Sequence, residues 1–145
     1  MTLRSFFPIM MFITAATAPV AASAEVDTSP GPGGVFRLKP GVYVSNGQPC
    51  SDPANAAIRV YDGKGIRGSA THGCVAKIVK KVGNRFTVDE TCTDTPAGAG
   101  KRTTARQIVT VSNAIEFAID ERGQVTTYHY CPVYQLPGSL KGLQN

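Results

Sequence analysis

The chain has 145 residues, with 15 lysines and arginines against 10 aspartates and glutamates, and its formal net charge is +5. Its 42% hydrophobic and 17% charged residues are typical of a globular protein and exclude a disordered one. The length allows one domain, and the chain shows no internal repeat of the kind that builds solenoids.

The N-terminal segment, residues 1–24, has the three-part layout of a secretory signal peptide. Arg4 precedes an apolar run over residues 6–13, and smaller residues follow up to an Ala-Ser-Ala tripeptide that ends at Ala24. The apolar run is shorter than the roughly 20 residues that a membrane-spanning helix needs, and Pro8 interrupts it. The sequence therefore predicts cleavage near Ala24 and a periplasmic or secreted protein without a transmembrane segment.

Residues 25–33 are rich in proline and glycine, and we expect a disordered leader there, followed by a single β domain over residues 34–145. The first strand pattern covers residues 36–44. A second pattern over residues 56–61 leads into Asp-Gly-Lys-Gly at 62–65, which predicts a hairpin turn because glycine supplies positive φ.

Residues 66–82 show the clearest alternation in the chain, with one mostly apolar face and one mixed, basic face. We expect either one long bent strand or two strands that meet at Gly73, where glycine permits a bulge. A turn at Gly83-Asn84 then leads into a strand over residues 85–92. The next segment, residues 93–102, predicts a loop because it is rich in glycine, alanine and proline.

Three further strand patterns cover residues 107–111, 114–119 and 124–131, and an irregular tail begins at Pro132. No segment keeps the 3.6-residue period of an amphipathic helix. Seven or eight short strands at hairpin spacing predict an all-β domain, either an antiparallel sandwich or a small closed barrel. We prefer the barrel, because closure protects the edge of a long strand.

The expected exported part of the chain contains an even number of cysteines: Cys50, Cys74, Cys92 and Cys131. An oxidising compartment then predicts two disulfides. Opposite residues of a hairpin face the same side, so Cys74 can meet either Cys50 or Cys92. We favour Cys50–Cys74 with Cys92–Cys131, because this pairing clamps the 93–102 loop to the last strand. Cys74–Cys92 with Cys50–Cys131 stays open as the alternative.

The motif His-x-Cys occurs twice, at His72-Gly73-Cys74 and at His129-Tyr130-Cys131. Residues i and i+2 share one face of a strand, so two neighbouring strands would present two cysteines and two histidines suited to zinc or copper. Thiolate ligands must stay reduced, whereas an exported chain is oxidised. We therefore predict no cofactor, and keep His72 and His129 as alternative metal ligands.

No group of residues typical of a catalytic site stands out. The serines lie outside Gly-x-Ser-x-Gly, and the even cysteine count leaves no spare thiol. The neighbours Asp89 and Glu90 point to opposite faces of an extended strand. Glu90 shares a face with Val88, which fits an inward carboxylate or, more ordinarily, a solvated residue near a strand end. We therefore favour a non-enzymatic protein.

Basic residues gather on the expected outer face of the long strand and around the glycine-rich loop. We expect them to bind an anionic ligand or an acidic protein partner in the cell envelope, with a face that serves only solubility as the alternative. Nucleic acid is excluded as a partner because no aromatic side chains alternate with them. The expected ligand-binding residues are Arg67, Lys77, Lys81, Arg85, Lys101 and Arg102.

Residues 50–57 (CSDPANAA), followed by YDGKG at 61–65, resemble a pattern in small exported bacterial proteins of uncharacterised function. That resemblance covers most of residues 41–131 and implies no activity. The expected architecture is also similar to that of periplasmic inhibitors of C-type lysozyme, although their Ser-Gly-x-x-Tyr-type motif is missing. The sequence thus predicts an exported binding module. One alternative is a hydrolase inhibitor that inserts the 93–102 loop, and the second is a small His/Cys metal-binding protein.

Overall fold

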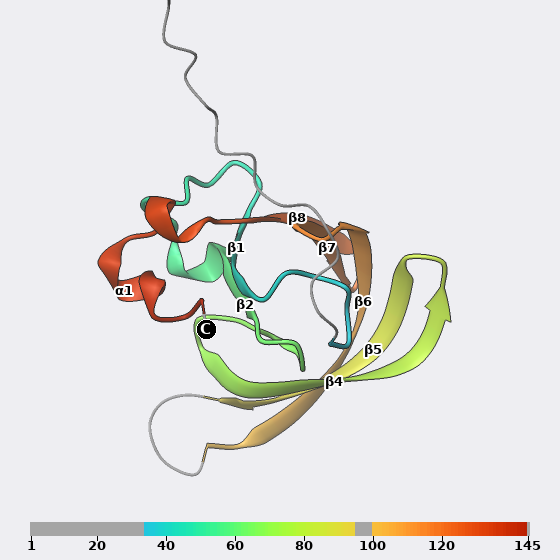
Figure 1. Ribbon diagram of the computed structural model, residues 1–145. Coiled ribbons are helices and arrows are strands. Elements are labelled where there is room, and N and C mark those ends of the chain that lie inside the picture. Colours follow the sequence, from blue (N-terminus) through green and yellow to red (C-terminus); the bar gives the residue numbers. More distant parts are fainter. Residues whose placement is uncertain (1–33, 95–99, 145) are drawn as a thin grey trace, which may run out of the picture.

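The computed structural model describes residues 34–94 and 100–144. Eight antiparallel strands form one sheet in the order β3-β2-β1-β8-β7-β6-β5-β4, and the sheet curls into a nearly closed barrel (Figure 1). The all-β prediction and the preference for a barrel are confirmed. The expected signal peptide, the expected leader and the centre of the 93–102 loop lie outside the described residues.

Each strand pairs with its neighbours in sequence, except that β3 and β4 form no ladder and β1 pairs with β8. The strands are β1 (Gly41–Ser45), β2 (Ile58–Tyr61), β3 (Ile66–Arg67), β4 (Thr71–Val82), β5 (Arg85–Asp94), β6 (Arg102–Asn113), β7 (Glu116–Glu121) and β8 (Gln124–Tyr130). Short helical turns are η1 (Asn55–Ala57), η2 (Val133–Gln135) and α1 (Gly138–Lys141). Among the described residues, no helix has the length and apolar character needed to cross a membrane.

The long alternating segment forms two strands that part at residues 68–70, and β4 itself is irregular. Its register against β5 shifts between His72 and Val75 and again between Ile78 and Lys80. Gly73 has a φ of 55°, a conformation that glycine adopts without steric strain, so the expected bulge lies there. No glycine marks the second register shift in the sequence.

Aromatic side chains fill the barrel. The rings of Tyr43 and Phe117 have centroids 5.0 Å apart, and Phe36 packs edge-on against Phe86 at 5.5 Å. Phe36 precedes the first strand, which begins only at Gly41 rather than at the expected residue 36. Backbone hydrogen bonds from Val35 and Lys39 reach the turns at one end of the barrel, so this irregular segment plugs that end.

The C-terminal tail packs against the outside of the barrel, where η2 and α1 lie beside β1 and β2 (Figure 1). The outward residues of these two strands are consequently apolar as well. The second core cluster consists of Val42, Val44, Ile58, Val60, Cys131 and Leu136, with Cys50, Leu140 and Leu143 packed against it.

Closure of the barrel between β3 and β4 uses a side chain as well as the backbone. Ala76 donates its N–H to the carbonyl oxygen of Lys64 at 2.9 Å, and Ile66 donates its N–H to Oε1 of Glu90 at 2.9 Å. A Cβ at Gly65 would lie 2.7 Å from the carbonyl oxygen of Cys74 and would overlap the Glu90 carboxylate, so only glycine fits. Because β3 has two residues, it covers only the start of β4.

Candidate functional site

A pocket of about 450 Å³ lies at the barrel end where β5 ends and β6 begins. This volume falls within the range of roughly 300–1,000 Å³ that small-molecule sites occupy. Ile66 and Ile119 give the pocket an apolar wall, and Thr71 and Thr103 add hydroxyl groups. The described residues thus form a mouth on one end of the barrel, opposite the end that the segment before β1 plugs.

Glu90 supplies the buried acidic group of this pocket and is 5% exposed, and Glu121 adds an exposed carboxylate at its rim. Its Oε1 accepts the N–H of Ile66 at 2.9 Å, and its Oε2 accepts a hydrogen bond from Nε2 of Gln107 at 3.4 Å. Burial raises the pKa of Glu90 to about 7, against the lowering effect of both hydrogen bonds. The inward carboxylate, the less ordinary of the two interpretations from the sequence, is therefore the one that forms.

Arg59 supplies the positive charge of the pocket, and sequence reasoning did not select it as a site residue. It lies opposite Tyr43 in the β1–β2 ladder and therefore shares the inward face of that core residue. Its guanidinium is 5.0 Å from the ring centroid of Tyr128. Nη1 donates to the carbonyl oxygens of Ala56 and Ile58. Within the described part of the chain, the ion pairs found leave Arg59 without a carboxylate partner.

The signal that could have identified Arg59 is its alternation with neighbours in β2. That alternation is hidden because the tail covers the outer face of β2, so Ile58 and Val60 are as apolar as inward residues. A polar residue between two apolar residues is normally the outward-facing one, so the pattern alone places Arg59 on the outer face. Only the position of the tail shows that Arg59 is the inward residue.

Lys77 and Arg85 lie on the outer face of the barrel, near acidic groups. Lys77 is opposite Asp89, which Arg106 holds through two hydrogen bonds of 2.8 and 2.9 Å. The hydrogen bond from Arg106 lowers the pKa of Asp89. The guanidinium of Arg85 lies 3.8 Å from the carboxylate of Asp120. The outer face is therefore of mixed charge rather than uniformly basic.

The expectation that Lys77 and Lys81 share the outer face is wrong. The second bulge of β4 reverses the alternation, so Lys81 pairs with the buried residue Phe86 and its ammonium lies 5.1 Å from the centroid of that ring. Arg67 ends β3, and Lys101 and Arg102 lie at the start of β6. The six expected ligand-binding residues consequently do not form one surface.

The two disulfides join Cys50 to Cys131 and Cys74 to Cys92. The favoured pairing of Cys50 with Cys74 and of Cys92 with Cys131 is therefore wrong, and the alternative is correct. The bulge at Gly73 places Cys74 across from Cys92 in the β4–β5 ladder. The loop after β1 brings Cys50 to the end of β8, where Cys131 also donates its N–H to Val42.

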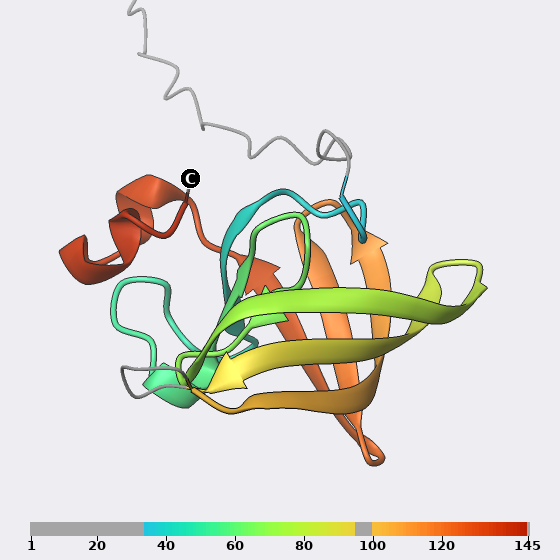
Figure 2. The same ribbon diagram turned by 90° about the horizontal axis from the view of Figure 1, so that it is seen from below.

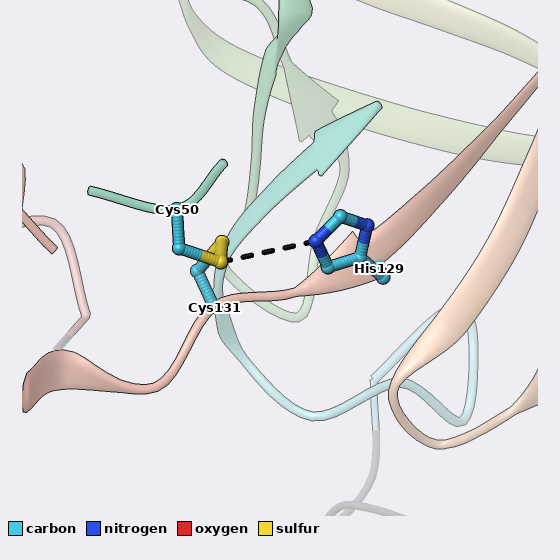
Figure 3. A group of neighbouring side chains, drawn as sticks. All are labelled: Cys50, His129 and Cys131. Carbon is cyan, nitrogen blue, oxygen red and sulfur yellow. Dashed lines mark hydrogen bonds between the residues drawn. A yellow bond between two sulfur atoms is a disulfide. The ribbon is translucent and has the colours of Figure 1, made fainter. Parts of the chain in front are cut away.

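The metal site of two cysteines and two histidines, kept as an alternative from the sequence, does not assemble among the described residues. The close groups of possible ligands are Cys50, His129 and Cys131 in one place and Cys74, Glu90 and Cys92 in another. Figure 3 shows the first group, in which His129 Nε2 is 3.8 Å from Cys50 Sγ. Sulfur in a closed disulfide offers no thiolate to a metal ion, so in the oxidised chain this is a packing contact.

Residues 50–57, whose pattern resembles small exported bacterial proteins, form the loop end and η1 beside the pocket mouth. That resemblance, and the similarity in architecture to lysozyme inhibitors, stay predictions that rest on the sequence. No family model, curated protein or solved structure matches the chain.

Proposed function

We propose that the protein is an exported, non-enzymatic binding module that takes a small anionic, partly apolar ligand into the mouth pocket. The observation that carries this proposal is Arg59, an inward guanidinium in the pocket wall that forms no ion pair with a described residue. A partly buried cation that no carboxylate pairs with favours an anion from solution. The proposal keeps the anionic ligand expected from the sequence and moves its site from the outer face to the barrel mouth.

The other groups of the pocket suit the same ligand. Ile66 and Ile119 would contact its apolar part, and Gln107 and the threonine hydroxyls would orient its polar atoms. Glu90 has a pKa raised to about 7 by burial, so it is neutral below that pH and does not repel an anion. A neutral carboxyl can also donate a hydrogen bond to the ligand.

Export is part of the proposal and is supported by two observations. The segment over residues 1–24 has the signal-peptide layout, and all four cysteines are paired in disulfides, which persist in oxidising compartments. The hydrolase-inhibitor alternative depends on the 93–102 loop, whose residues 95–99 lie outside the described part, and it stays a prediction.

The fluorescent probe anilinonaphthalene sulfonate tests the pocket, because it combines an aromatic body with a sulfonate. We expect Arg59→Gln to weaken its binding at least about tenfold, since a lost charge-assisted contact is worth roughly 1.5–3 kcal/mol. The measurement is a fluorescence titration at about pH 6, below the raised pKa of Glu90. Arg67→Gln is the matched control: it removes the same charge from the neighbouring strand and should leave the affinity unchanged.

A second variant tests the space in the pocket separately from its charge. Ala105 lines the mouth on β6, and Ala105→Trp should block the probe while keeping every charge in place. Circular dichroism establishes that each variant is folded. If Arg59→Gln and Ala105→Trp both bind the probe as the unmodified protein does, the barrel mouth is not the binding site.

A further inference from the structure

The free edge of β4 is the longest unpaired stretch of strand in the described sheet. β4 is the last strand in the sheet order, and its ladder partner is β5 alone. Across the seam, a backbone hydrogen bond joins Ala76 of β4 to Lys64. Because the backbone groups of a strand alternate in direction, those of Ile78 point to the same side as those of Ala76. Beyond β3, that side carries no partner strand among the described residues.

The edge is unusually apolar for a strand in contact with water. Val75, Ile78, Val79 and Val82 are 47%, 42%, 49% and 62% exposed, and they make up more than half of the exposed large hydrophobic residues described. Figure 2 shows the β4–β5 hairpin reaching beyond the neighbouring strands. A long, exposed, apolar edge is a template for a further strand.

The charges of this edge identify the kind of strand that it fits. Lys77, Lys80 and Lys81 lie within the same six residues, and β4 contains no acidic residue. The acid opposite Lys77 is Asp89, whose charge Arg106 already neutralises. A second copy of the chain would place lysines beside lysines, which is unfavourable between paired strands.

We propose that the edge of β4 over Lys77–Val82 is a docking site for an acidic, extended segment of a partner protein, which adds to the sheet as a further strand. Backbone hydrogen bonds to the outward groups of β4 supply affinity that is independent of sequence. Carboxylates on one face of the segment meet Lys77 and Lys80, which pair with outward residues of β5, and apolar side chains on its other face cover Ile78. The site lies on the sheet edge and does not depend on the ligand proposed for the mouth pocket.

A labelled peptide of about eight residues that alternates valine with glutamate is the probe, since strands commonly have this length. We expect it to bind in a fluorescence-anisotropy titration at low ionic strength, with affinity falling as salt screens the charges. Two peptides serve as controls. One alternates valine with lysine, and the other keeps the glutamates but carries N-methyl groups on its pairing edge; neither should bind.

Protein variants test the location. The triple variant Lys77→Glu, Lys80→Glu, Lys81→Glu should weaken peptide binding at least tenfold. Lys101→Glu, Arg102→Glu, Lys141→Glu changes the net charge by the same amount away from the edge and should bind as the unmodified protein does. Ile78→Pro removes an outward N–H that β5 does not use, and should also abolish binding.

Three results would overturn the proposal. Equal binding of the N-methylated peptide would mean that charge alone attracts it and no strand is added. Full affinity in the triple Glu variant would place the peptide elsewhere on the molecule. Dimerisation of the unmodified protein in sedimentation velocity that Ile78→Pro abolishes would make a second copy the occupant. The comparison of the three peptides uses only the unmodified protein, so it remains a valid test even if a variant misfolds.

Discussion

Glu90→Gln will stabilise the protein at about pH 8 by roughly 2–4 kcal/mol and will leave its stability at about pH 4 unchanged. The reason is the burial of the Glu90 carboxyl, which is 5% exposed and has its pKa raised from 4.5 to about 7. Ionising it inside the barrel opposes folding, whereas glutamine is neutral at every pH.

The direction of the pH dependence follows from proton binding. The folded pKa of Glu90 lies above the unfolded value of 4.5, so between these values the folded chain binds more protons than the unfolded one. The free energy of unfolding of the unmodified protein therefore falls as the pH rises from about 4.5 to about 7, and this contribution is flat on either side. Asp89, whose pKa is lowered by Arg106, titrates below this window and has the opposite sign.

Glutamine preserves the contacts that matter for folding. Its side-chain oxygen can accept the N–H of Ile66, as Oε1 of Glu90 does now, and so keep the link from β5 to β3 at the seam between β3 and β4. Its amide can donate to the side-chain oxygen of Gln107 once that amide rotates by half a turn. Glu90→Ala should destabilise the protein at about pH 4, because the N–H of Ile66 would lose its partner, whereas at about pH 8 removal of the buried charge offsets that loss.

Urea unfolding across about pH 4 to pH 8 measures the effect, and Glu121→Gln at the exposed rim of the pocket is the control for charge removal alone. The decline in stability through the window should disappear in Glu90→Gln and persist in Glu121→Gln. A decline of unchanged size in Glu90→Gln would assign it to another group and remove the case for a neutral Glu90 in the pocket.

The strands were predictable because their turns are marked by glycine and their faces alternate. The bulge at Gly73 was indicated by its residue type, since a positive φ of 55° needs glycine. The bulge between Ile78 and Lys80 was not, because its residues also suit a regular strand. That single insertion moved Lys81 to the other face and made the expected basic surface wrong.

The pocket could not be predicted from local sequence, because contacts between distant segments of the chain form it. Glu90 was placed on the correct face, but its burial depends on the approach of Gly65 from the turn before β3, more than twenty residues earlier in the chain. Arg59 was missed because the tail makes both faces of β2 apolar or half-buried. Both disulfide pairings satisfied the hairpin rule, and the choice required knowing that β8 lies beside β1.

The variant Cys50→Ala, Cys131→Ala will lose about 4–5 kcal/mol of stability, and Cys74→Ala, Cys92→Ala about 3 kcal/mol, by the chain-entropy relation. The two disulfides join residues 81 and 18 apart in sequence. Cross-linking the longer loop removes more conformations from the unfolded chain, so its loss raises the entropy of that state further. Urea unfolding of the two double variants at one pH measures the difference.

Packing should increase the difference in stability between the two double variants. Cys131 is fully buried in the cluster that holds the tail against β1 and β2, so alanine there leaves a cavity as well as an open loop. Cys74 and Cys92 join two strands that their ladder already holds together, so their loss leaves the β4–β5 hairpin paired. A larger loss from the Cys74–Cys92 variant would mean that the β4–β5 hairpin, and not the attachment of the tail, limits the stability of the barrel.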